Sequence, residues 1–278
     1  MSNVNRIFNS LIKPYFFLCL INLVIYSAEN IVKHSFSVQE FIKSLGAICI
    51  GLDGCEGIII GCGTLWFVYS LAIIKFLAIY LNKSTSIIVA ILFSVLGVLL
   101  HYFDMNYYWA ITNVLLAYPL FVLGQCCRYA KVQLVIDKLK QGKCVVFLVV
   151  SMVLLFAVYV ISSFNGSAWM FKGEYGNNML LFFIGAILGT IALSLISISL
   201  NRYGLNLIRM LSVGNILILA FQWKVCCYVV NYTDKYIGFG AIKDICLCGA
   251  AVLIMLAFIP VIKLFCTYLP AVVGGRRY

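Results

Sequence analysis

Long apolar runs separated by short polar segments dominate the pattern of this chain of 278 residues. A transmembrane helix needs about 20 mostly apolar residues, and eight runs reach or approach that length. They cover residues 15–32, 65–81, 86–102, 108–127, 144–163, 179–200, 210–230 and 244–266. The pattern therefore predicts an all-α, polytopic integral membrane protein. We expect a helical bundle of about eight transmembrane helices that forms a single domain over residues 1–278.

A further apolar stretch, residues 41–63, does not fit this pattern. It contains Lys43, Asp53 and Glu56, and glycines interrupt it six times. Charges and glycines at this density disfavour a regular spanning helix. We expect an interfacial or re-entrant element on the outer side, not a ninth span.

Composition narrows the class of protein further. Residues of the AVILMFWYC group make up 64% of the chain, and charged residues only 10%, against about 25% in ordinary soluble domains. A soluble enzyme, a nucleic-acid-binding module and a disordered protein are excluded on this ground. The net charge of +11 comes from basic residues dispersed between apolar runs, so we expect the lipid bilayer, not nucleic acid, as the partner.

The basic residues also predict an orientation. With the N-terminus inside, the inner segments carry twelve of them and the outer segments five. The positive-inside rule therefore favours both termini in the cytoplasm. We expect a multi-pass protein of a bacterial inner membrane.

Three lysines fall inside the predicted spans, where charge is costly and marks candidate function. Lys75 lies about two-thirds along the second span. It either faces a polar cavity and binds an anion, or snorkels or pairs within the bundle. Lys224 and Lys263 lie near the ends of the predicted seventh and eighth spans, and for both we favour snorkelling.

Two segments have the residue types of a carbohydrate site. The outer loop 164–178 mixes aromatic residues with amides, glycines and an acid. Aromatic rings stack on the apolar faces of sugars and amides bind hydroxyls, but a membrane-interface aromatic belt has a similar composition. Gln222 and Trp223 lie near the outer end of the seventh span; Gln222 either binds a substrate or joins two helices.

Other catalytic chemistry has little support in the sequence. His34 and His101 are the only histidines, and either would serve as a general base only with a partner that the sequence does not show. The twelve cysteines lie mostly in apolar runs, without histidine at zinc spacing. We therefore expect no metal site.

Five stretches resemble one family, the acyltransferase family 3 membrane proteins, in the branch of fucose 4-O-acetylase-like sugar O-acetyltransferases. The stretches occur in the family's order and extend over nearly the whole chain. They are Ser10–Phe16 (SLIKPYF), Gly63–Leu71 (GTLWFVYSL), Tyr118–Gly124 (YPLFVLG), the pair Asn165-Gly166 with Tyr175-Gly176-Asn177, and Leu211–Trp223 (LSVGNILILAFQW).

The chain also departs from the family pattern. The resemblance implies about ten spans and begins at the family's third helix, so we expect an N-terminally shortened chain. The two helices without a counterpart would carry an Arg-x10-His pair thought to act in catalysis, and no such pair occurs here. The late helix has Gln222 where the family has histidine, and glutamine cannot exchange a proton near neutral pH. We therefore assign no catalytic residue and expect an impaired or inactive chain.

The resemblance implies a membrane O-acyltransferase that uses acetyl-CoA or another acyl-CoA as donor, without a metal. The acceptor would be a carbohydrate hydroxyl of a cell-surface polysaccharide or of its lipid-linked precursor. Lys75 and the basic segment 128–143 would meet the anionic donor. The acceptor side would be lined by Trp66, Tyr175, Asn177, Gln222 and Trp223.

Two other functions stay open. A transporter or flippase for a glycan or lipid-linked sugar predicts two related halves, which the sequence does not display, and charges of both signs within the spans. The other is a non-enzymatic partner subunit of an intact acyltransferase. The sequence does not specify the acceptor sugar, the acyl group or the oligomeric state.

Overall fold

The computed structural model describes residues 3–53, 58, 60, 63–103, 109–129, 144–170, 174–201, 206–236 and 241–273. Most of these residues are helical, and eight helices among them are long and apolar enough to cross a membrane. The predicted all-α chain with eight candidate spans is confirmed for this part of the sequence.

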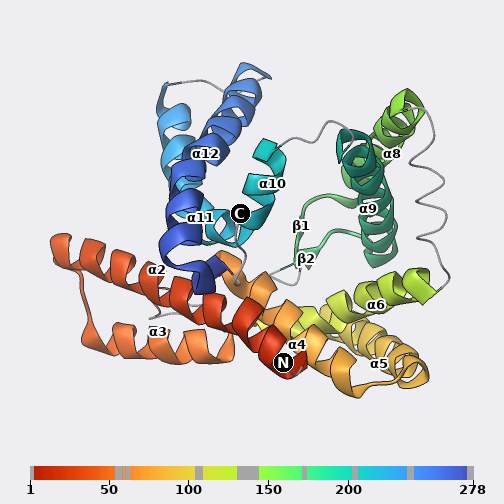
Figure 1. Ribbon diagram of the computed structural model, residues 1–278, viewed down its shortest axis with the longest axis horizontal. Coiled ribbons are helices and arrows are strands. Elements are labelled where there is room, and N and C mark those ends of the chain that lie inside the picture. Colours follow the sequence, from red (N-terminus) through yellow and green to blue (C-terminus); the bar gives the residue numbers. More distant parts are fainter. Residues whose placement is uncertain are drawn as a thin grey trace. The chain divides into compact units, whose positions relative to one another are not determined.

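The helices form two compact units, one of residues 1–79 with 206–278 and one of residues 80–205 (Figure 1). The first unit holds α1 (Asn3–Ile7), η1 (Phe8–Ile12), α2 (Lys13–Val32), α3 (Val38–Ile50), η2 (Gly63–Leu65), α4 (Trp66–Tyr80), α10 (Asn206–Val213), α11 (Asn215–Tyr236), α12 (Ala241–Tyr268) and η4 (Pro270–Val273). The second holds α5 (Lys83–Tyr102), α6 (Ala110–Tyr129), α8 (Cys144–Asn165), β1 (Ala168–Trp169), β2 (Glu174–Tyr175) and α9 (Met179–Asn201).

The first unit packs around α2, which contacts α3, α11, η2 and η4. The buried residues Tyr15, Leu18, Cys19 and Leu23 recur every one to four positions along α2, so one face of this helix forms the core. The Tyr15 hydroxyl donates to the Ile48 carbonyl at 2.8 Å. This bond joins the start of α2 to the end of α3 and fixes the two helices antiparallel.

The segment that follows the first span contains no ninth spanning helix among its described residues, as expected. α3 has only 13 residues, which is too short to cross a bilayer. Ser37 caps its start by accepting a hydrogen bond from the Glu40 backbone N–H. Gly51 ends it with φ 71°, and a Cβ there would lie 2.7 Å from the Tyr69 ring, so the chain turns away from α3 at this glycine.

The seventh span begins later than predicted. We expected one helix over 210–230, but a turn at Gly214 separates α10 from α11, and the spanning helix is Asn215–Tyr236. A Cβ on Gly214 would lie 2.2 Å from Ile262 Cγ1 on α12. The break therefore occurs where the backbone lies against α12, a contact that apolar periodicity does not reveal.

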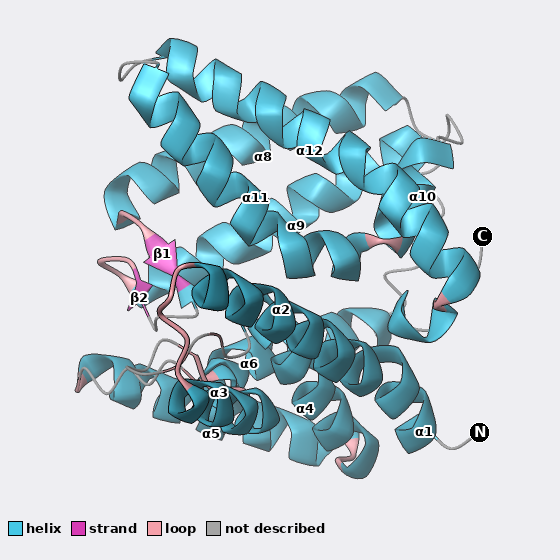
Figure 2. Cartoon of the chain, turned by 90° about the vertical axis from the view of Figure 1, so that its left-hand side faces the viewer, coloured by secondary structure: helices cyan, strands magenta, loops and turns pink. Residues whose placement is uncertain are grey.

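The second unit consists of two antiparallel helix pairs, α5 with α6 and α8 with α9. α5 and α6 approach closely at Gly97, where a Cβ would meet Leu116 Cδ2 at 2.6 Å. Between α8 and α9 the chain forms a short antiparallel hairpin of β1 and β2, seen as the two strands in Figure 2. This hairpin belongs to the loop in which the sequence predicts carbohydrate contacts.

Candidate functional site

The hairpin is anchored in the second unit by Tyr175. Its side chain is buried, and its hydroxyl lies 3.5 Å from Asn113 Oδ1 on α6, to which it donates. Its ring meets the rings of His101 and Phe182 edge-on, at centroid distances of 5.5 and 5.2 Å. Tyr175 therefore joins α5, α6 and α9. Burial also raises its pKa to about 12, so it remains a neutral hydrogen-bond donor at physiological pH.

Asn165, at the end of α8, organises the rest of the loop. Its side-chain amide donates to the Tyr175 carbonyl at 2.9 Å, and its Oδ1 accepts from the Asn178 N–H at 2.7 Å. Its own carbonyl accepts from the Asn177 N–H at 2.7 Å. Gly176, with φ 78°, makes this arrangement possible because a Cβ there would lie 2.4 Å from the Asn165 carbonyl oxygen.

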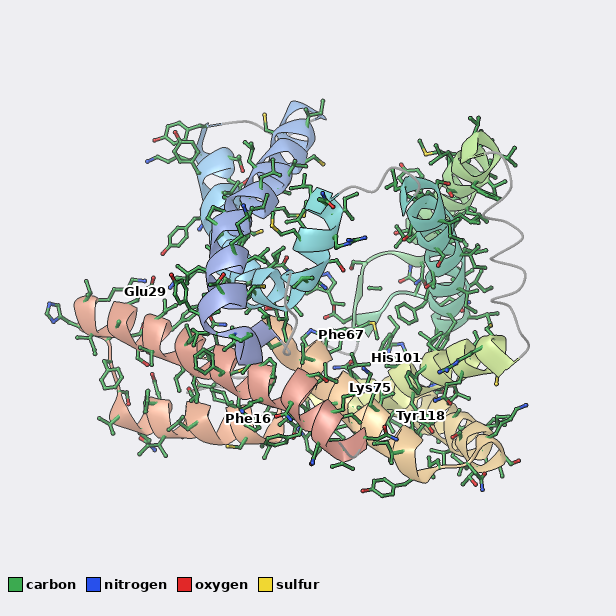
Figure 3. All side chains as sticks on the ribbon, viewed as in Figure 1. Phe16, Glu29, Phe67, Lys75, His101 and Tyr118 are labelled. Carbon is green, nitrogen blue, oxygen red and sulfur yellow. The ribbon has the colours of Figure 1, made fainter. Side chains whose placement is uncertain are left out.

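Two buried polar atoms lie beside Tyr175. His101 Nδ1 and Asn113 Nδ2 have no hydrogen-bond partner among the residues that the structure describes. His101 is at the end of α5 (Figure 3), and Asn113 is buried on α6. An imidazole nitrogen can accept and an amide N–H can donate, which is the complement of a hydroxyl group. The hydrogen-bonding capacity of these two buried atoms is therefore unused by the residues that the structure describes.

The same loop presents polar and aromatic groups to solvent. Trp169 on β1 is 48% exposed and pairs in register with Glu174 on β2. Asn177 follows the hairpin and is also exposed. An indole face, a carboxylate and an amide thus occur together within a loop that Asn165 and Tyr175 hold in one conformation.

A second polar cluster lies in the first unit, between α2 and α11. Lys224 on α11 forms an ion pair with Glu29, which lies near the end of α2 (Figure 3). Its ammonium lies 4.2 Å from the centroid of the Tyr26 ring, a cation–π distance. Tyr228, one turn along α11, donates to Glu29 Oε1 at 3.5 Å. Further along, Asn22 Nδ2 donates to the Ala220 carbonyl at 3.0 Å.

The ion pair corrects the expectation that Lys224 snorkels. Because α11 runs from Asn215 to Tyr236, beyond the predicted end at residue 230, Lys224 lies about 14 Å from one end of the helix and about 18 Å from the other. Snorkelling requires a position near a helix end. Lys224 instead pairs with a carboxylate of another helix.

The six residues predicted to bind substrate are divided between the units. Trp66 begins α4, half-buried, with its ring edge-on to Phe67 at 6.0 Å. Lys75 is also half-buried on α4 (Figure 3). On α11, Gln222 is half-buried and Trp223 is 54% exposed. These four lie in the first unit, where Thr64 joins the segment before Trp66 to α11 through a hydrogen bond to the Leu219 carbonyl.

The other two residues lie in the second unit, and the structure brings them together. Tyr175 and Asn177 flank Gly176, and Asn165 binds the backbone of both. The sequence interpretation did not single out Asn113, a buried amide within an apolar helix, or Glu29. Glu29 follows Asn22 and Tyr26 at helical spacing, which is the signal that would have found this polar face of α2.

Within the described residues, no group of three or more histidine, cysteine or acidic side chains could hold a metal ion. The basic segment expected to meet the donor lies mainly at 130–143, outside the described residues. Comparison with known proteins finds no family model, no curated protein and no solved structure that matches this chain.

Proposed function

We propose that this protein is a membrane O-acyltransferase that acetylates a carbohydrate hydroxyl of a cell-surface polysaccharide or of its lipid-linked precursor. The proposal rests on the resemblance to acyltransferase family 3 and on one structural observation. The loop with the Asn165-Gly166 and Tyr175-Gly176-Asn177 stretches is held by hydrogen bonds and exposes Trp169, Glu174 and Asn177. An aromatic ring can stack on the apolar face of a sugar, and an acid and an amide beside it can bind the hydroxyl groups. This loop therefore suits a carbohydrate.

The remaining parts of the proposal follow from the same resemblance. The protein lies in a bacterial inner membrane with both termini in the cytoplasm, and acetyl-CoA or another acyl-CoA donates from that side. Lys75 and the basic segment 128–143 meet the donor phosphates. By the resemblance alone, Trp66, Gln222 and Trp223 of the first unit are further candidate residues for the acceptor. No general base is assigned, because Gln222 stands where the family has histidine.

The direct test compares surface glycan from cells with and without the gene by mass spectrometry. Because the sequence has no Arg-x10-His pair, we expect an impaired enzyme, so deletion of the gene should remove only part of the O-acetyl groups from the glycan. Reintroduced protein should restore them, whereas Trp169→Ala should restore them less well. Tyr236→Ala, which removes an exposed aromatic side chain at the end of α11, is the control. An acetylation pattern that does not depend on the gene would overturn the proposal.

One observation favours a second candidate function, transport of a glycan or lipid-linked sugar. Glu29 and Lys224 are charges of opposite sign within candidate spans. A pocket of about 270 Å³ lies beside Glu29 and is lined by Ala28, Glu29, Val32, Lys33 and Tyr228. Paired intramembrane charges beside a pocket are typical of substrate pathways.

Transport is tested in proteoliposomes that contain a fluorescent glycolipid, with a membrane-impermeant quencher outside. If the protein moves the lipid, quenching proceeds beyond the outer leaflet, and Glu29→Gln slows it. Quenching that stops at the outer leaflet, as in protein-free liposomes, would exclude glycolipid flipping.

A further inference from the structure

A groove between α8 and α9 has a graded chemistry along its length. Its volume is about 290 Å³, near the lower limit for small-molecule pockets, so it suits a segment of a chain rather than a whole lipid. The lining residues are Val158, Ile161, Ser162, Asn165, Gly166, Ser167, Ala168, Leu181, Phe182, Gly185 and Ala186.

The polar lining residues of this α8–α9 groove lie toward its loop end, together with Leu181 and Phe182 of the first turn of α9, and the part deeper in the spans is apolar. Ser162, Asn165 and Ser167 lie at the loop end, where the two spans terminate. Val158 lies about 10 Å from Asn165 along α8, further into the span. This distance matches the depth at which an amphipathic molecule passes from the headgroup region into the hydrocarbon. No charged residue lines the groove, so it is suited to an uncharged head.

The groove also contacts the candidate acceptor site. The Phe182 side chain, which lines the groove, meets the Tyr175 ring edge-on at 5.2 Å. Asn165 lines the groove and binds the Tyr175 carbonyl. A hydrocarbon chain in the groove would therefore place its polar head at the hairpin.

We propose that this groove binds the hydrocarbon chain of a glycolipid, with the uncharged, hydroxyl-bearing part of its head at Ser162 and Ser167. The inference rests on the proposed function and makes it more specific, because it selects a lipid-linked sugar, not finished polymer, as the acceptor. The apolar part is recognised by Val158, Ile161 and Phe182, and the small residues Gly185 and Ala186 leave space for the chain.

Gly185 allows the groove to be filled with little strain. A Cβ at this position would meet Ile161 Cγ2 at 3.6 Å, an ordinary contact distance, and Gly185 lies within a regular helix. Gly185→Leu should therefore fold while its side chain occupies the groove. Gly249→Leu on α12 is the matched control, because a Cβ there meets no atom within 4 Å. Ala186→Leu, from the neighbouring position, is a second groove-filling variant.

The test uses the full chain in phosphatidylcholine nanodiscs with a photoactivatable decyl glucoside. We expect saturable labelling of peptides from 158–168 and 181–186, despite the excess of phospholipid. Labelling should fall about tenfold in Gly185→Leu and Ala186→Leu and stay unchanged in Gly249→Leu. Unlabelled decyl glucoside should compete, whereas glucose alone should not.

Labelling that does not saturate, or that persists in both groove-filling variants, would show an ordinary lipid-facing surface and overturn the inference. The proposed function fails separately, when glycan acetylation is independent of the gene. Saturable labelling without gene-dependent acetylation would support glycolipid binding in the groove and contradict the proposed acyltransferase activity. Gene-dependent acetylation that Gly185→Leu leaves intact would exclude the groove as the acceptor site.

Discussion

The ammonium of Lys224 on α11 pairs with the carboxylate of Glu29 on α2, and the Tyr26 ring covers the same ammonium at 4.2 Å. The two side chains are 23% and 32% exposed, but the ammonium nitrogen of Lys224 is itself buried. Together with the Asn22 bond to the Ala220 carbonyl, the pair determines how α2 lies against α11.

Lys224→Met should destabilise the first unit by about 2 kcal/mol, below the loss for breaking a fully buried pair. The cost arises because Glu29 keeps its charge but loses its cation. Thermal unfolding in detergent measures it as a lower Tm. Glu29→Gln combined with Lys224→Met should recover most of the loss, because no charge is then left unpaired. A double variant as unstable as the two single changes added together would contradict this role of the pair.

Gly176→Ala should destabilise the hairpin loop by about 1 to 3 kcal/mol. The φ of 78° is unfavourable for alanine, and its Cβ would collide with the Asn165 carbonyl. Limited proteolysis between α8 and α9 should become faster, together with a lower Tm. Gly185→Ala, nearby on α9 with space for a Cβ, is the control and should neither speed proteolysis nor lower the Tm, because alanine favours a helix over glycine. Equal proteolysis rates in the two variants would show that Gly176 does not fix the loop.

Asn165→Ala should have a larger effect than Asn177→Ala. Asn165 is buried, and its removal leaves the Tyr175 carbonyl and the Asn178 N–H without their side-chain partner. We expect a loss of about 1 to 3 kcal/mol for such buried groups. Asn177 is exposed, and its side chain makes one long bond of 3.4 Å to the Phe164 carbonyl. Tm values of the two variants in the same detergent provide the comparison, and equal losses would contradict the central place of Asn165.

The spans could be predicted from the sequence because lipid imposes a length and an apolar composition on each helix. The start of the seventh span could not, because the break at Gly214 depends on the close approach of Ile262, 48 positions along the chain. Whereas α11 continues to Tyr236, the predicted end at residue 230 made Lys224 look like a residue near a helix end. Its partner Glu29 comes from the first span, and no local pattern predicts which helices will be neighbours.

The candidate site could be predicted only in part, because its geometry also depends on contacts between residues far apart in the sequence. The residue types of the loop indicated carbohydrate chemistry, and Tyr175 and Asn177 do lie together in it. The sequence could not show that Tyr175 is buried against α6 while Trp169 is exposed. Which aromatic residue faces outward depends on the register of a two-residue hairpin, and such a register follows from tertiary contacts.

The raised pKa of Tyr175 predicts a loss of stability at high pH. Below about pH 10 both the folded and the unfolded chain keep the phenol proton, and the contribution is fully present. Between about pH 10 and the folded-state pKa of about 12, the unfolded chain ionises first, so stability falls as pH rises. Tm measured across this range should drop more steeply for the natural chain than for Tyr175→Phe. Tyr232→Phe, which changes an exposed tyrosine, should match the natural chain; parallel curves for all three would contradict the prediction.

Gly214→Ala should destabilise the first unit and should be rescued by a change on another helix. The new methyl group would overlap the Ile262 side chain, whose Cγ1, Cδ1 and Cγ2 all lie within 2.8 Å of the Cβ position. Ile262 is fully buried, so it has little room to move, and overpacking of this kind costs about 1 to 3 kcal/mol. Ile262→Ala alone opens a cavity and costs about 2 to 5 kcal/mol. The double variant should therefore be more stable than the sum of the two single losses predicts, because the methyl group enters the space that Ile262 leaves. Additive losses in Tm would show that α10 and α11 do not meet α12 at this glycine.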